Sequence, residues 1–64
     1  MEEIGTNIRL LRKTKNITQE ELANALHISY QAISKWENGS SQPDIALLPA
    51  IANYFGVSID ELFG

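Results

Sequence analysis

The sequence predicts an all-α fold, a compact unit of five helices in a single domain over residues 1–64. Apolar side chains recur at spacings of three and four residues, which is the period of a helix with one buried face. Residues that favour helix starts and glycines that favour helix ends divide the chain at successive points. No repeat, low-complexity stretch or linker divides it into further domains.

The first helix is expected from about Glu2 to Thr14, with Ile4, Ile8 and Leu11 forming one buried stripe. The second helix is expected from about Gln19 to Leu26. Its start is marked by a capping box, in which Thr18 is the N-cap and Glu21 follows three residues later. Its buried face consists of Leu22, Ala23 and Leu26.

The third helix is expected over roughly Tyr30–Glu37, with Ser29 as its N-cap and Gly39 as the C′ residue that ends it. Ile33 and Trp36 face inward. Only His27 and Ile28 remain for the turn after the second helix. Two short helices joined by so tight a turn, the second with a polar outer face, have the layout of a DNA-reading helix-turn-helix.

The last part of the chain predicts a loose turn over Asp44–Leu47 and then a regular helix to Phe55, with Pro49 in its first turn. Gly56 ends that helix, and Ser58 with Glu61 forms a capping box that opens a short fifth helix. The core face of the fourth helix consists of Leu48, Ile51, Ala52 and Phe55.

These motifs, in this order and spacing, resemble the DNA-binding domain of the phage-repressor, or xenobiotic-response-element (XRE), family of transcription regulators. The resemblance covers nearly the whole chain and implies a repressor-like fold with sequence-specific binding of a double-stranded DNA operator. It rests on Ile4-Gly5, Ile8-Arg9, Leu11-Arg12, Thr18-Gln19, Leu22-Ala23, Ile33-Ser34, Trp36-Glu37-Asn38-Gly39, Pro43-Asp44 and Gly56-Val57-Ser58.

In this layout the third helix lies in the major groove and its outer face reads bases. Gln31 is the best candidate reader, because its amide matches the N6/N7 edge of adenine. Lys35 can reach guanine or a phosphate, Tyr30 a thymine methyl or a phosphate, and Ser34 is a weaker candidate. The alternative interpretation of all four is an ordinary polar helix surface.

A second set of residues is expected to hold the DNA backbone. Gln19 and Ser29 stand at helix N-termini, where free N–H groups attract anions. The resemblance implies phosphate contacts at Gln19, Ser29 and Asn38, and the loop residues Ser40 and Ser41 join this set. Better-known family members often carry lysine or arginine in that loop, so its serines predict weaker binding by an isolated domain.

Other residues are expected to be structural. The resemblance implies that Arg12 and Glu37 face each other between the first helix and the end of the third, and Trp36 is a core residue. His27 stands where related sequences usually carry glycine, so we expect a positive φ there. A single histidine without any cysteine makes a poor metal site, and no cofactor is expected.

The net charge of −3 has the wrong sign for a protein that approaches phosphates. Residues 1–16 nevertheless carry a net charge of +2, while the remainder carries −5. One alternative is therefore a helix-turn-helix interaction module, such as an antitoxin-like or accessory regulator, with little DNA affinity of its own. The chain offers no nucleophile beside a base and no phosphate loop, so an enzyme is not expected.

No apolar run is long enough for a membrane span and no signal-peptide pattern opens the chain, which predicts a cytoplasmic protein without a membrane partner. The family resemblance implies a bacterial or phage origin and no small-molecule site in this domain. Because one recognition helix covers few base pairs, we expect a homodimer on DNA. Ile59 and Phe63 are the candidate contact residues, since both cannot face the core if Val57 and Leu62 do.

Overall fold

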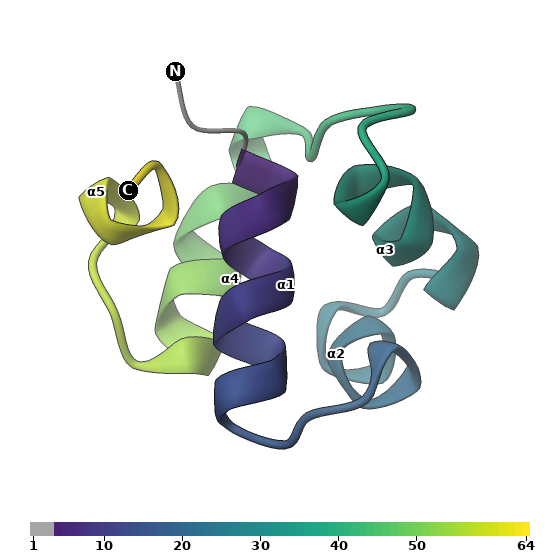
Figure 1. The fold of residues 1–64 in the computed structure, drawn as a ribbon, viewed down its shortest axis with the longest axis horizontal. Coiled ribbons are helices and arrows are strands. Elements are labelled where there is room, and N and C mark those ends of the chain that lie inside the picture. Colours follow the sequence, from purple (N-terminus) through teal and green to yellow (C-terminus); the bar gives the residue numbers. More distant parts are fainter. Residues whose placement is uncertain (1–3) are drawn as a thin grey trace.

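The structure is a computed structural model that describes residues 4–64 (Figure 1). The expected helix start at Glu2 lies outside the described residues. Within them the chain forms five α-helices and one 3-10 turn, and the predicted all-α fold is confirmed. These elements are α1 (Ile4–Thr14), α2 (Gln19–Leu26), α3 (Tyr30–Glu37), the 3-10 turn η1 (Ile45–Leu47), α4 (Leu48–Phe55) and α5 (Ile59–Leu62).

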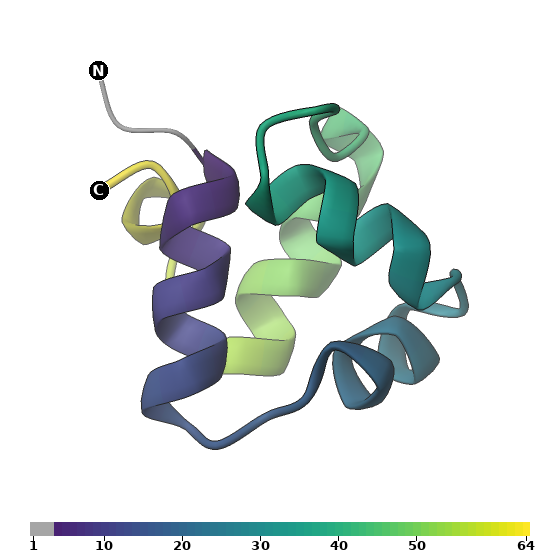
Figure 2. The ribbon, with the colours of Figure 1, turned by 45° about the vertical axis from the view of Figure 1, so that its right-hand side comes forward.

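The helices pack around α1 and α4, which cross the middle of the molecule (Figure 1). The pair α2 and α3 lies on one side of α1, and α5 lies on the other, as both views show (Figures 1 and 2). A hydrogen bond joins α1 to α5, because the amide of Asn7 donates to the carbonyl oxygen of Leu62 at 2.9 Å. The helix-turn-helix of α2 and α3 therefore packs on one side of α1, and α5 at the end of the chain is bonded to the other side.

A single apolar core holds the helices together, and each fully buried aliphatic side chain contributes about 1.5–3 kcal/mol. The core positions predicted on the second, third and fourth helices are all buried. Leu11 differs from expectation, because it packs against the core but remains partly exposed. The buried side chains are Ile4, Ile8, Leu22, Ala23, Leu26, Ile33, Trp36, Leu48, Ile51, Ala52, Phe55 and Leu62.

Helix starts follow the predicted capping signals. Before α2, the N–H of Glu21 donates to the hydroxyl of Thr18 at 3.0 Å and the N–H of Thr18 donates to the Glu21 carboxylate at 2.8 Å. Ser58 and Glu61 repeat this capping box before α5. Asp44 caps η1, and Pro49 lies in the first turn of α4, where its missing N–H costs no intrahelical hydrogen bond.

Helices α1 to α4 each end in a left-handed residue, at Asn16, His27, Gly39 and Gly56 respectively. In each case the residue that follows the left-handed one donates its N–H to the carbonyl oxygen five residues before it, as in Ile28 to Ala23. This is the Schellman pattern. The expected positive φ of His27 is confirmed at 60°. Asn16 was not predicted to be left-handed, although asparagine is among the residues that tolerate this region.

No helix within residues 4–64 has the length and apolar character that crossing a bilayer requires. Those residues also contain no cluster of three or more histidine, cysteine or acidic side chains arranged to hold a metal ion.

Candidate nucleic-acid interface

The outer face of α3 carries the predicted base-reading residues. Ile33 and Trp36 are buried and anchor the helix, which turns the opposite face toward solvent. Tyr30 is 48% exposed, and Gln31 and Lys35 are also exposed. Ser34 is only partly buried rather than fully outward, so it lies at the edge of this face. Three of the four predicted readers thus stand on one open helix surface.

The end of α3 is held very close to α1 by a glycine. A Cβ atom built on Gly5 would stand 1.7 Å from the carbonyl oxygen of Trp36 and 2.6 Å from its carbonyl carbon. Any larger residue at position 5 would therefore force the two backbones apart. The position of the recognition helix depends on this absence of a side chain.

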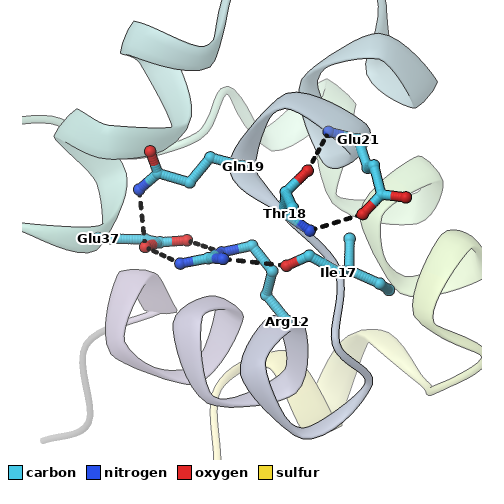
Figure 3. A network of polar contacts seen from close by, with 6 residues as sticks. All are labelled: Arg12, Ile17, Thr18, Gln19, Glu21 and Glu37. Atoms are coloured by element: carbon cyan, nitrogen blue, oxygen red, sulfur yellow. Dashed lines mark hydrogen bonds and ion pairs between the residues drawn. The ribbon is translucent and has the colours of Figure 1, made fainter.

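A polar network lies beside that contact and joins three helices (Figure 3). The guanidinium of Arg12 on α1 holds the carboxylate of Glu37 at the end of α3 through two hydrogen bonds, from Nε at 2.7 Å and from Nη2 at 3.0 Å. Arg12 also donates to the carbonyl oxygen of Ile17 at 2.9 Å. The side-chain amide of Gln19, at the start of α2, donates to the same carboxylate at 3.1 Å.

This network is largely shielded from solvent, since the side chains of Arg12 and Glu37 are 11% and 6% exposed. Burial raises the pKa of the Glu37 carboxyl. The hydrogen bonds from Arg12 and Gln19, together with the positive charges of Arg12 and Arg9, outweigh burial and hold that pKa below its ordinary value. Glu37 is therefore charged at neutral pH. The pairing of Arg12 with Glu37 that the family resemblance implied is present in the structure.

Several predicted phosphate ligands already have partners inside the protein. The amide nitrogen of Gln19 is directed to Glu37, and the hydroxyl of Ser29 accepts the N–H of Ala32 at 3.4 Å. The side-chain oxygen of Asn38 accepts the N–H of Ser40 at 2.8 Å. The N–H groups of Ser40 and Ser41 both donate to the carbonyl oxygen of Lys35, at 2.9 and 3.2 Å.

These bonds limit what each residue can offer to a phosphate. Gln19 retains its backbone N–H, because the first-turn N–H groups of a helix have no intrahelical acceptor. Ser40 and Ser41 retain exposed hydroxyls, and Asn38 retains its amide nitrogen. The loop after α3 therefore presents neutral side-chain donors and no cation.

An open hollow of about 370 Å³ lies between α1, the start of α2 and the end of α3. It brings together Gln19 and Asn38 from the predicted phosphate set with Ser34 from the predicted readers. It also includes Arg9 and Lys13, which the sequence analysis did not assign to the site. Their signal was present in the basic first sixteen residues, but only the packing of α1 shows which helices those cations adjoin.

The fold and the exposed face of α3 match those of helix-turn-helix proteins. The model of the helix-turn-helix family matches residues 8–62, and the chain belongs to this family of transcription regulators. Over 60 residues, or 94% of its length, the chain is 47% identical to the HTH-type transcriptional activator BcrR of Enterococcus faecalis. Over 61 residues, or 95% of its length, it is 41% identical to the antitoxin PezA of Streptococcus pneumoniae.

The chain spans 29% of the length of the first relative and 39% of the second. Among solved structures, it superposes on the P22 c2 repressor protein, determined in complex with a synthetic operator, with a TM-score of 0.88 and 32% identity. That superposition covers 98% of this chain and 96% of the repressor chain. The resemblance to phage repressors drawn from the sequence is confirmed.

Proposed function

We propose that this chain is the DNA-binding domain of a transcription regulator, which acts most simply as a repressor and binds a specific double-stranded operator with α3 in the major groove. The observation that carries the proposal is the outer face of α3. It exposes Gln31 and Lys35 while Gly5 and the Arg12–Glu37 pair hold its far end in place. A rigidly held helix with exposed amide and ammonium donors suits direct base reading.

Each reader has a distinct proposed role. The amide of Gln31 donates and accepts at an adenine edge, and Lys35, one turn later, donates to guanine or to a phosphate. Tyr30 stands at the first position of α3 and contacts a thymine methyl or a phosphate. Ser34 is partly buried, so its contact with bases is the weakest of the four.

Backbone contacts position the domain without reading sequence. We assign this role to the N-terminal ends of α2 and α3, at Gln19 and Ser29, and to the donors of the loop after α3. The loop donors are the amide of Asn38 and the hydroxyls of Ser40 and Ser41.

The test is selection of a binding site from random duplex DNA, followed by an electrophoretic titration of the selected site against a scrambled one at low salt. The proposal expects an enriched motif and tighter binding to it than to the scrambled duplex. Uniformly weak binding with no enriched motif would contradict it.

A homodimer on DNA is part of the same proposal. Leu62 is fully buried, whereas Ile59, the first residue of α5, and Phe63, its C-cap, are 41% and 51% exposed. We propose that this exposed pair meets its copy across a two-fold axis on the operator. Footprinting on the selected site tests it, and a single protected half-site without a palindrome would count against the dimer.

A protein-interaction module with little DNA affinity is the second candidate. Two observations favour it, the net charge of −3 and the 41% identity to an antitoxin. The same titration separates the two candidates, because an interaction module would bind neither duplex at low salt. We further propose that the domain acts in the cytoplasm as a binding module and not as an enzyme, and its membership of the helix-turn-helix family of regulators supports this.

A further inference from the structure

We propose that Arg9 and Lys13 of α1 bind backbone phosphates of the same DNA that α3 reads, and we call these two side chains the α1 strip. The inference rests on the proposed DNA-binding function and adds a third element to the interface, beside α2 and α3.

The α1 strip lies beside the recognition helix. Arg9 and Lys13 are four residues apart on α1, so they lie on one side of the helix about one turn apart. Both are exposed, and both line the hollow that contains Ser34 and Asn38 of α3. Since Ser34 borders the face that reads bases, the α1 strip flanks the second half of the recognition helix.

The cations of the α1 strip outnumber the free carboxylates of the hollow. Within residues 4–64 the carboxylate that lines it is Glu37, which is already held by Arg12 in a two-point ion pair. Neither Arg9 nor Lys13 has a described carboxylate within ion-pairing distance. Arg9 acts on Glu37 through its field alone, lowering the pKa of that carboxyl. The hollow therefore keeps two positive charges available for an anion.

The distribution of acidic residues is consistent with this role. Apart from Glu37, the acidic side chains of the described part lie on α2, before η1 and on α5. Glu20 shares a neighbouring hollow with Lys13. We therefore expect Arg9 to make the stronger phosphate contact. The acidic side chains of α2, Glu20 and Glu21, stand in its first turn, whereas the outer face of α3 before Glu37 carries none.

The proposed ligand of the α1 strip is the sugar-phosphate backbone that borders the major groove occupied by α3. A helix in the major groove is flanked by sugar-phosphate backbones, and α2 begins against one of them. Gln19, at that beginning, lines the same hollow as the α1 strip. The phosphates next to the one at α2 are then within reach of two long cationic side chains. Each cation that neutralises a phosphate releases counterions and steepens the dependence of binding on salt.

The experiment measures operator affinity for the full chain and for the variants Arg9→Gln and Lys13→Gln. The salt concentration is varied from roughly 50 to 200 mM, the range over which phosphate contacts change affinity steeply. Lys15→Gln is the matched control, because Lys15 is an exposed cation just beyond the end of α1 that lines neither hollow. Arg9→Lys tests whether charge alone is sufficient. Melting curves of each variant establish that it is folded.

Each lost phosphate contact should reduce the slope of log affinity against log salt concentration by roughly 0.9. Over this four-fold range of salt, the variant should therefore lose about 3.5-fold less affinity than the unmodified chain. Binding to operator and to scrambled duplex should weaken by the same factor, Arg9→Lys should keep the original slope, and the control should match the unmodified chain. If the unmodified chain binds neither duplex, the proposed function fails and the strip fails with it. If it binds but both strip variants keep its salt slope, the strip alone is refuted. Weakening confined to the operator would also refute it, since that result marks a base contact.

Discussion

Replacement of Gly5 by alanine tests whether close approach of two backbones sets the position of the recognition helix. The new Cβ would stand 1.7 Å from the carbonyl oxygen of Trp36 and 3.3 Å from the N–H nitrogen of Glu37. Even in weak C–H···O contacts, carbon and oxygen are about 3.3–3.6 Å apart. The start of α1 and the end of α3 must therefore separate by more than an ångström, and both clashing groups are backbone atoms that cannot rotate away.

The expected cost follows from this geometry. Overpacking costs about 1–3 kcal/mol and occasionally more, whereas alanine gains about 1 kcal/mol over glycine in helix propensity. These two terms leave a loss of about 0–2 kcal/mol. Separation of the helices would also loosen the Arg12–Glu37 pair two turns further along α1, whose charged hydrogen bonds are worth about 2 kcal/mol, so we expect a net loss of about 2–4 kcal/mol. At about 4–8 °C per kcal/mol for a domain of this size, Tm should fall by about 8–32 °C.

Thermal and urea unfolding followed by circular dichroism measure the effect. Thr6→Ala is the control, since Thr6 is the next residue on α1 and is exposed. Its Tm should change by no more than a few degrees. A Gly5→Ala variant as stable as the control, or more stable than the unmodified chain, would refute the argument from backbone contact.

Three further predictions concern single residues. Gln31→Ala should weaken operator binding by about 1–3 kcal/mol and relax preference at one base pair without changing Tm, as measured by titration and renewed site selection; an unchanged selected site would remove Gln31 from the readers. His27→Gly should raise Tm slightly, because the left-handed cost of about 1–2 kcal/mol exceeds the entropy cost of glycine of about 0.5–1 kcal/mol; a clear drop would show that the histidine is not strained. The lowered pKa of Glu37 means that the folded state favours its carboxylate, so this stabilisation is present above the unfolded pKa of about 4.3 and is lost as pH falls through the lower folded value. Urea unfolding from pH 6 downward should show this loss, roughly across that window, and Glu37→Gln should be less stable at neutral pH with a flatter acid profile; parallel profiles would contradict the assignment.

Local signals in the sequence were sufficient for the boundaries of the helices after α1. Thr18 with Glu21, and Ser58 with Glu61, satisfy their own N–H groups within four residues, so no distant contact is needed to start those helices. Gly56 and the left-handed His27 end helices through bonds to the preceding turn. The buried faces of the helices could also be predicted, because helical spacing places apolar residues on one side of a helix whatever they later pack against.

The candidate site was predictable in part. The outer face of α3 follows from the positions of Ile33 and Trp36, since the readers are what remains opposite them. The Arg12–Glu37 pair joins positions 25 residues apart and came from family resemblance rather than from spacing. The partial burial of Ser34 was not foreseen, because it depends on the elements packed around α3, and Ser34 lines a hollow together with residues of α1 and α2.

The sequence by itself determined the helices, their caps, the apolar core and the helix-turn-helix layout, because each of these depends on contacts within one or two turns of chain. Only the tertiary structure decided which surfaces those helices share. It brought Gly5 against the Trp36 carbonyl, directed the amide of Gln19 to Glu37, and placed Arg9 and Lys13 beside the recognition helix. The physical reason is that these relations depend on the distance and angle between helices, which are set by the fit of the whole core and leave no periodic signal in any one segment.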